Sequence, residues 1–235
     1  MTQDIPTHEN FSDLEQLDHD MDEFWKDQGF PAPATLVLRY VDSKGNETQR
    51  IVDVRLFADT PYGTMLHGHC RYADAERDFK IERIQHCIDL NSGETIEDVY
   101  SHLVSLYEKT PECSFNRVID RHIDTLRATM QIAQGNGFSL NEQAKVVQQI
   151  CQKVSKDQRI PLELARGLVE AYSAPERIGL DQTFRLIVGR LDKSLSTPEK
   201  ESVLRLCTRV AKLKGAPSPA ARELLEYMAK RLTLE

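Results

Sequence analysis

The chain has 235 residues, enough for one large domain or for two small ones that each bury a core. Its formal charge of -7 at pH 7 argues against a protein that coats nucleic acid or membrane surfaces generally. No apolar run approaches the ~18 residues of a membrane-spanning helix, and the acidic N-terminus is not typical of a secretion signal. We therefore expect a cytoplasmic protein without membrane contact.

Residues 1–33 form an acidic segment in which Lys26 is the only Lys or Arg. Apolar side chains recur in it at three- and four-residue spacing, which indicates an amphipathic helix: Phe11, Leu14, Leu17, Met21, Phe24 and Trp25. This helix either docks on the protein's own body or seats against a partner subunit. Pro31 and Pro33 are expected to end it.

Residues 34–93 change to a period of two, which is typical of strands. We expect strands at residues 36–41, 50–57, 64–72, 78–81 and 85–90. The turn residues between them include Gly45 and Gly63. Short strands with frequent turns predict a small barrel or sandwich.

The remainder is helical, with a connecting helix in residues 94–113 and an all-α bundle in residues 114–235. Helices are expected at residues 96–107, 115–133, 141–154, 161–172, 180–191, 198–213 and 219–232. The last hundred residues also repeat with an offset of 56, which aligns Cys151 with Cys207 and Ala165 with Ala221. Two stacked helical hairpins would bury the matched faces. The fold class is therefore α+β, and the five spread cysteines are expected to be reduced thiols, several of them packed as small hydrophobes.

Three motifs between residues 36 and 84 resemble the WYL domain, a small SH3/Sm-like β-barrel of bacterial regulators that senses ligands or nucleic acid. They are Leu38-Arg39-Tyr40-Val41-Asp42-Ser43-Lys44-Gly45, then Thr64-Met65-Leu66-His67-Gly68-His69-Cys70, then Arg77-Asp78-Phe79-Lys80-Ile81-Glu82-Arg83-Ile84. The chain has Thr64 and Met65 where the family has its Trp and Tyr, so the resemblance implies the fold more than the ligand.

The resemblance implies an anion site on the barrel, and eight residues are its candidates: Arg39, Tyr40, His69, Arg71, Arg77, Phe79, Lys80 and Arg83. The cations would bind a nucleotide or single-stranded nucleic acid, and the rings would supply apolar or hydrogen-bonding contact. The alternative is a solvated face on which the arginines pair with Asp74, Glu76, Asp78 and Glu82.

Residues 114–235 resemble the TerB-like domain of tellurite-resistance proteins. Its loop motif is kept in Asp157, Ile160 and Glu163 of the first repeat, whereas the second keeps Gly215 and has Lys214 and Ala220 at the acidic positions. A hard cation needs several oxygen ligands, so we expect no metal site here. The segments His67-Gly68-His69-Cys70 and His86-Cys87 contain zinc-ligand residue types, but they lack the close cysteine spacing of a structural zinc site. The alternative is that they are ordinary barrel residues, and we expect no zinc.

No motif of an enzyme or cofactor-binding loop occurs, so we expect a non-enzymatic protein without cofactors. The leading hypothesis is a regulatory or sensing protein whose barrel binds an anionic ligand. The alternative is a TerB-like stress-response scaffold or interaction module, with a homodimer or a regulatory protein as partner.

Overall fold

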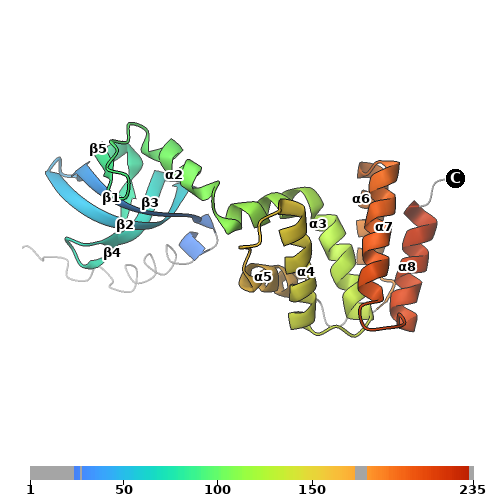
Figure 1. The fold of residues 1–235 in the computed structure, drawn as a ribbon. Coiled ribbons are helices and arrows are strands. Elements are labelled where there is room, and N and C mark those ends of the chain that lie inside the picture. The colour runs from blue at the N-terminus through green and yellow to red at the C-terminus, as the bar shows by residue number, and fades with distance from the viewer. Residues whose placement is uncertain (1–23, 27, 173–178, 233–235) are drawn as a thin grey trace, which may run out of the picture. The chain divides into compact units, whose positions relative to one another are not determined.

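The computed structural model describes residues 24–26, 28–172 and 179–232, and it divides the chain into two compact units, residues 1–110 and 111–235. The first unit contains a five-stranded antiparallel sheet and the second contains helices, which confirms the α+β class (Figure 1). Phe11, Leu14, Leu17 and Met21 of the expected amphipathic helix lie outside the described residues, and residues 24–26 are helical. No helix in the described ranges has the length and apolar character needed to cross a membrane.

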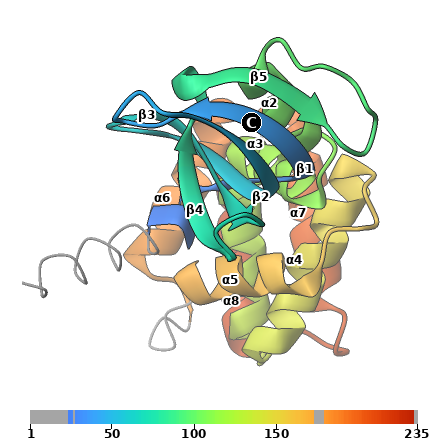
Figure 2. The same ribbon diagram turned by 90° about the vertical axis from the view of Figure 1, so that its left-hand side faces the viewer.

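The sheet has the strand order β4-β3-β2-β1-β5. Its strands are β1 (Phe30–Val41), β2 (Glu47–Thr60), β3 (Gly63–Cys70), β4 (Ala75–Lys80) and β5 (Ile84–Asp89), with the 3₁₀ helix η1 (Ile81–Arg83) between the last two. In the described part of the chain no ladder joins β4 to β5, so the sheet is open. Both edges are visible in Figure 2.

The prolines expected to end a helix lie inside β1 instead. Phe30 and Pro31 pair with β2, and the register then shifts before Ala34, which leaves Pro33 in the irregularity. Because proline has no N–H to donate, a bulge is where a strand tolerates it. The strand therefore begins six residues earlier than the expected start at Leu36.

The sheet is curled around an apolar core. The Tyr40 ring on β1 packs edge-on against Phe79 on β4, with 5.2 Å between centroids, although β2 and β3 separate the two strands in the sheet. The Tyr40 hydroxyl accepts a hydrogen bond from the Lys80 backbone N–H at 3.3 Å. Helix α2 (Val99–Tyr107) adds Val99 and Leu103 to the same core.

The helical unit consists of α3 (Pro111–Gly135), α4 (Leu140–Ser155), α5 (Leu162–Tyr172), α6 (Gln182–Ser194), α7 (Thr197–Ala211) and α8 (Pro219–Leu232). The sequence repeat corresponds to two helical hairpins, α4–α5 and α7–α8, which both contact α3. Cys151 and Cys207 are fully buried, as are Ala165 and Ala221. Helices α4 and α7 also begin alike, each with a Ser–Glu capping box.

The five cysteines are all buried. Burial raises the pKa of the Cys87 thiol to about 11 and that of the Cys151 thiol to about 12. Cys70, Cys87, Cys151 and Cys207 belong to hydrophobic clusters, so several of the cysteines pack as small hydrophobes, as expected from the sequence.

Candidate functional site

Arg39 and Arg71, two of the predicted cationic contacts, are held by carboxylates of the sheet. The Nε of Arg39 lies 3.2 Å from Glu47. Arg71 makes a two-pronged contact with Asp53 at 2.8 and 2.7 Å, and this contact, together with the Thr35 hydroxyl, lowers the pKa of Asp53 to about 2. These pairs agree with the alternative of a surface of ion pairs, although the acids differ from those expected.

Tyr40, Phe79 and His69 also have partners within the unit. Tyr40 and Phe79 are 9% and 6% exposed, so their rings are core residues and offer no free face to a ligand. The Nε2 of His69 lies 3.4 Å from Asp74 and its Nδ1 lies 3.7 Å from Glu76. The structure therefore does not bring the eight predicted residues together in one site.

Arg77, Lys80 and Arg83 lie on β4 and η1, near one edge of the sheet. Lys80 is 3.9 Å from Glu82. Among the described residues no carboxylate lies within 4.0 Å of Arg77 or Arg83. These two arginines are what remains of the predicted anion site.

A histidine lies between two carboxylates on the outer face of β3 and β4. The Nδ1 of His67 is 2.8 Å from Asp78, and its Nε2 is 3.4 Å from Glu76. The ring of Trp25 covers His67 at a centroid distance of 5.2 Å and is itself 3% exposed. Here the described end of the N-terminal segment packs on the chain's own sheet.

The zinc alternative needed His86 or Cys87 on a strand next to His67 and His69. His67 and His69 do share a face of β3, but β2 and β1 separate β3 from β5, which carries His86 and Cys87. Cys87 is also buried in the core. Within the ranges that the structure describes, no group of three His, Cys, Asp or Glu side chains is arranged to hold a metal ion.

A groove of about 160 Å³ separates α4 from α7 in the helical unit. Its lining is mostly aliphatic: Val146, Ile150, Leu206, Val210 and Leu213. Below it Ala133 of α3 joins Val146 and Val210 in one buried cluster, and α3 is seen between the two helices in Figure 1. Leu213 is 61% exposed, so the groove presents apolar surface to solvent.

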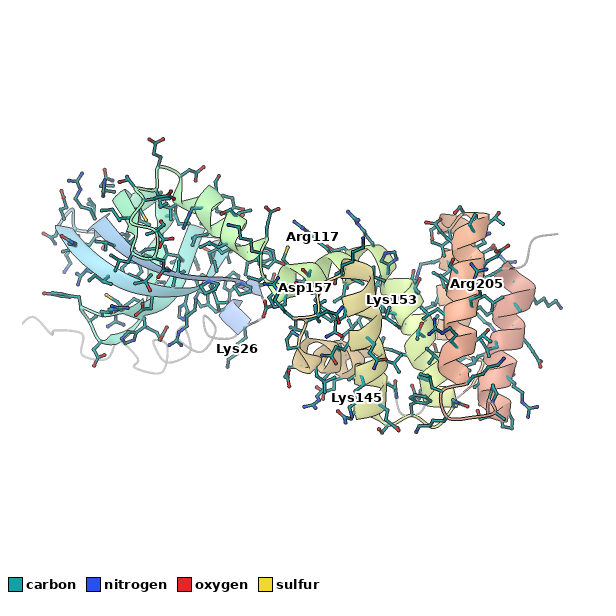
Figure 3. The ribbon with its side chains drawn as sticks, in the orientation of Figure 1. Lys26, Arg117, Lys145, Lys153, Asp157 and Arg205 are labelled. Carbon is teal, nitrogen blue, oxygen red and sulfur yellow. The ribbon has the colours of Figure 1, made fainter. Side chains whose placement is uncertain are left out.

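The polar side chains that line this groove are Gln149, Lys153 and Arg209, and none of them is acidic. In the described part of the chain neither Lys153 nor Arg209 has a carboxylate within 4.0 Å. Lys145 lies two turns before Lys153 on α4, and Arg205 lies on α7, where it pairs with Glu201 at 3.2 Å (Figure 3). The groove therefore combines an aliphatic surface with a cationic rim.

The charge of the chain is divided unevenly between the two units. Residues 111–235 contain 20 Lys and Arg against 15 Asp and Glu, whereas residues 1–110 contain 10 against 22. The helical unit is therefore the cationic one, opposite to the prediction that placed the basic contacts on the sheet. Counting charges separately for each half of the sequence would have shown this.

A second pocket of about 240 Å³ lies where α3 departs from helical geometry at His122, whose φ and ψ are -130° and 17°. It is lined by Ser114, Arg117, Val118, Arg121, His122, Val154 and Ser155. The Ser155 hydroxyl donates to the Cys151 carbonyl at 2.7 Å, and the Ser114 hydroxyl donates to Asp157 at 2.9 Å. Because both hydroxyls are engaged and a carboxylate is close, this pocket is the weaker candidate for binding an anion.

In the loop between α4 and α5, the Asp157 carboxylate is bound by side chains of the chain itself. The Asp157 carboxylate accepts from the Arg159 Nε at 2.9 Å, from its second guanidinium nitrogen at 2.8 Å and from the Ser114 hydroxyl. These contacts, led by Arg159, hold the pKa of Asp157 well below its usual range. The carboxylate is thus neutralised by the chain itself (Figure 3 labels it).

In the second repeat Lys214 links the two hairpins. Its Nζ donates to Glu142 at 2.8 Å and to the Gly137 carbonyl at 3.1 Å, and it lies 4.6 Å from the centre of the Phe138 ring. Lys214 therefore has a structural role in the contact between the second repeat and the start of α4.

The Glu142 carboxyl should titrate near pH 2, because Lys214 and then Ser139 donate to it and lower its pKa from the ordinary 4.5 to about 2. A lowered pKa means that the folded state favours the ionised form, so this stabilisation is complete above pH 4.5 and is lost as the pH falls toward 2. In Lys214→Met we expect the pKa to move back toward 4.5. Carboxyl ¹³C NMR measures it, with Lys230→Met as the control, and an unchanged titration in Lys214→Met would contradict the assignment.

Comparison of the chain with protein-family models, with curated proteins and with solved structures found no match.

Proposed function

We propose that this chain is a non-enzymatic interaction protein whose helical unit binds an acidic amphipathic helix in the groove between α4 and α7. The observation that carries the proposal is the lining of the groove, which is aliphatic and has Lys153 and Arg209 as its charged members. An amphipathic helix binds such a groove through apolar residues at positions i, i+3, i+4 and i+7. Acidic residues on its flanks would face the cationic rim.

Nucleic acid is the less suitable occupant of this groove. Proteins hold single strands by stacking the bases on aromatic rings beside a cationic track. The side chains that line the groove include no Phe, Tyr, Trp or His. Aliphatic side chains pack well against the leucines or methionines of a helix, so the lining favours a protein partner.

This proposal corresponds to the scaffold hypothesis. The TerB-like assignment of residues 114–235 is part of it and is supported by the two equivalent hairpins around α3. The WYL-like, SH3/Sm-like assignment of the sheet is also proposed. It is supported by the 3₁₀ turn before β5 and by the Tyr40–Phe79 contact, which curls β4 toward β1.

The test uses the full chain and a fluorescein-labelled probe peptide with leucines at helical spacing and glutamates elsewhere. Leu213→Asp removes apolar contact and adds a charge that repels the probe, so we expect fluorescence anisotropy to show affinity reduced about tenfold or more, or at least ~1.4 kcal/mol. Leu186→Asp is the matched control, because Leu186 is 58% exposed on α6 and does not line the groove. Equal loss in both variants would contradict the proposal.

The cationic rim is tested with a second pair of variants in the same assay. Lys153→Glu should weaken binding more than Lys230→Glu, which makes the same change in net charge on α8, away from the groove lining. A probe with lysines in place of the glutamates should bind poorly. If it binds as well as the acidic probe, the rim does not select for acidic partners.

A second candidate function is the binding of an anionic ligand by the sheet unit, and Arg77 and Arg83 favour it because no carboxylate is close to either among the described residues. Their charges could contact phosphates at the edge near β4. In the same assay, a labelled single-stranded oligonucleotide at low salt would bind the full chain, and Arg77→Ala with Arg83→Ala would abolish that binding while Leu213→Asp would not.

A further inference from the structure

The N-terminal segment has the composition that the groove between α4 and α7 requires. Residues 1–33 contain nine Asp and Glu against one Lys. Leu14, Leu17 and Met21 stand at positions i, i+3 and i+7, which is the anchor spacing of helix-in-groove binding. These anchors are aliphatic or thioether side chains, like the lining that they would meet.

We infer that the natural occupant of the groove is residues 4–23 of a second copy of this chain. This inference rests on the proposed function and names its partner. The aliphatic lining of the groove would receive Leu14, Leu17 and Met21, and Lys153 and Arg209 would face the acidic residues around them.

The charges of the two partners favour this occupant over an unrelated helix. The segment belongs to the half of the chain in which acids outnumber bases 22 to 10, and the groove belongs to the half in which bases outnumber acids 20 to 15. Opposite charge raises the rate of encounter and orients the partners, although screening by salt limits its contribution to affinity.

A second copy is the partner because each chain carries both halves of the contact. Reciprocal docking gives two equivalent interfaces related by a two-fold axis, which closes the assembly as a dimer. Trp25, buried against His67, ties the C-terminal end of the segment to the sheet of its own chain. The segment of each chain would thus join its own sheet unit to the helical unit of its partner.

Carbodiimide crosslinking of the full chain tests the inference, because it joins a lysine to a carboxylate only where the two are in contact. In an equal mixture of ¹⁴N- and ¹⁵N-labelled chains we expect crosslinks from Lys145 or Lys153 to acids of residues 4–23, with mixed-isotope pairs present. Leu17→Asp should reduce these crosslinks about tenfold, in line with a loss of ~1.4 kcal/mol, whereas Gln16→Asp adds the same charge and should leave them.

The outcomes separate this inference from the proposed function. Crosslinks only between chains of the same isotope would overturn the second copy as the partner. If residues 4–23 give no crosslinks while the probe peptide still binds in a manner sensitive to Leu213, the inference fails and the interaction function stands. If residues 4–23 give no crosslinks and the probe peptide does not bind either, the inference and the proposed function are both overturned.

Discussion

Trp25→Ala should lower the free energy of unfolding of the sheet unit by about 3–5 kcal/mol, the usual cost of truncating a buried Trp. Trp25 is the only Trp in the chain, and it is 3% exposed on the outer face of the sheet. Its loss uncovers the His67 ring and the contacts of that ring with Asp78 and Glu76. The effect should therefore be largest in β3 and β4.

Trp25→Phe is the matched variant for this experiment. The indole N–H is buried and has no hydrogen-bond partner among the described residues, so Phe keeps a ring on His67 without that unpaired donor. We expect a change below about 1.5 kcal/mol. Amide hydrogen exchange of β3 and β4 measures both variants, with α6 as an internal reference because the two units need not unfold together. Similar losses in the two variants would show that ring packing is not the source of stability.

Gly68→Ala should destabilise the sheet by about 1–3 kcal/mol or more, the range found for overpacking. A β-carbon at Gly68 would collide with the Asp53 carbonyl oxygen and would lie 2.8 Å from the Cα of Val54. Both obstacles are backbone atoms of β2, which is paired with β1 on one side and with β3 on the other. Neither can move without breaking a ladder.

Gly167→Ala is the control variant, which should raise stability where Gly68→Ala lowers it. Gly167 lies in α5, and a β-carbon there would meet no atom within 4 Å. Alanine should therefore stabilise this helix by about 0.5–1 kcal/mol, because it restricts the unfolded chain. Urea unfolding followed by hydrogen exchange distinguishes the two glycines. If Gly68→Ala left the free energy of unfolding unchanged, the close approach of β2 and β3 would not be rigid.

Most of the helical and strand segments could be predicted from the sequence, because periodicity and turn chemistry are local signals. Helix α8 has the expected bounds, and α4 extends the expected helix by one residue at each end. The expected start of β1 is six residues too late, because two prolines are typical of a chain break, whereas here a register irregularity accommodates Pro33 inside the strand. Such a bulge depends on the pairing with β2, and a single strand's sequence does not reveal it.

The candidate site was harder to predict from the sequence, because a cationic side chain can bind a ligand only if its neighbours in space leave it exposed and unpaired. Arg71 and Asp53 are 18 residues apart, and only the pairing of β2 with β3 brings them into contact. Tyr40 and Phe79 fell on buried faces although they occupy motif positions. The groove was missed because Val146 and Val210 look like ordinary core residues until α4 and α7 are seen to stand apart.

The burial of all five cysteines makes the surface of the described residues free of native thiols. A cysteine introduced at the exposed position of Lys145 would be accessible to a thiol reagent, whereas the five native cysteines are buried. A single spin label or dye could be attached without removing any native cysteine. Distances between labels on two copies would report directly on their assembly.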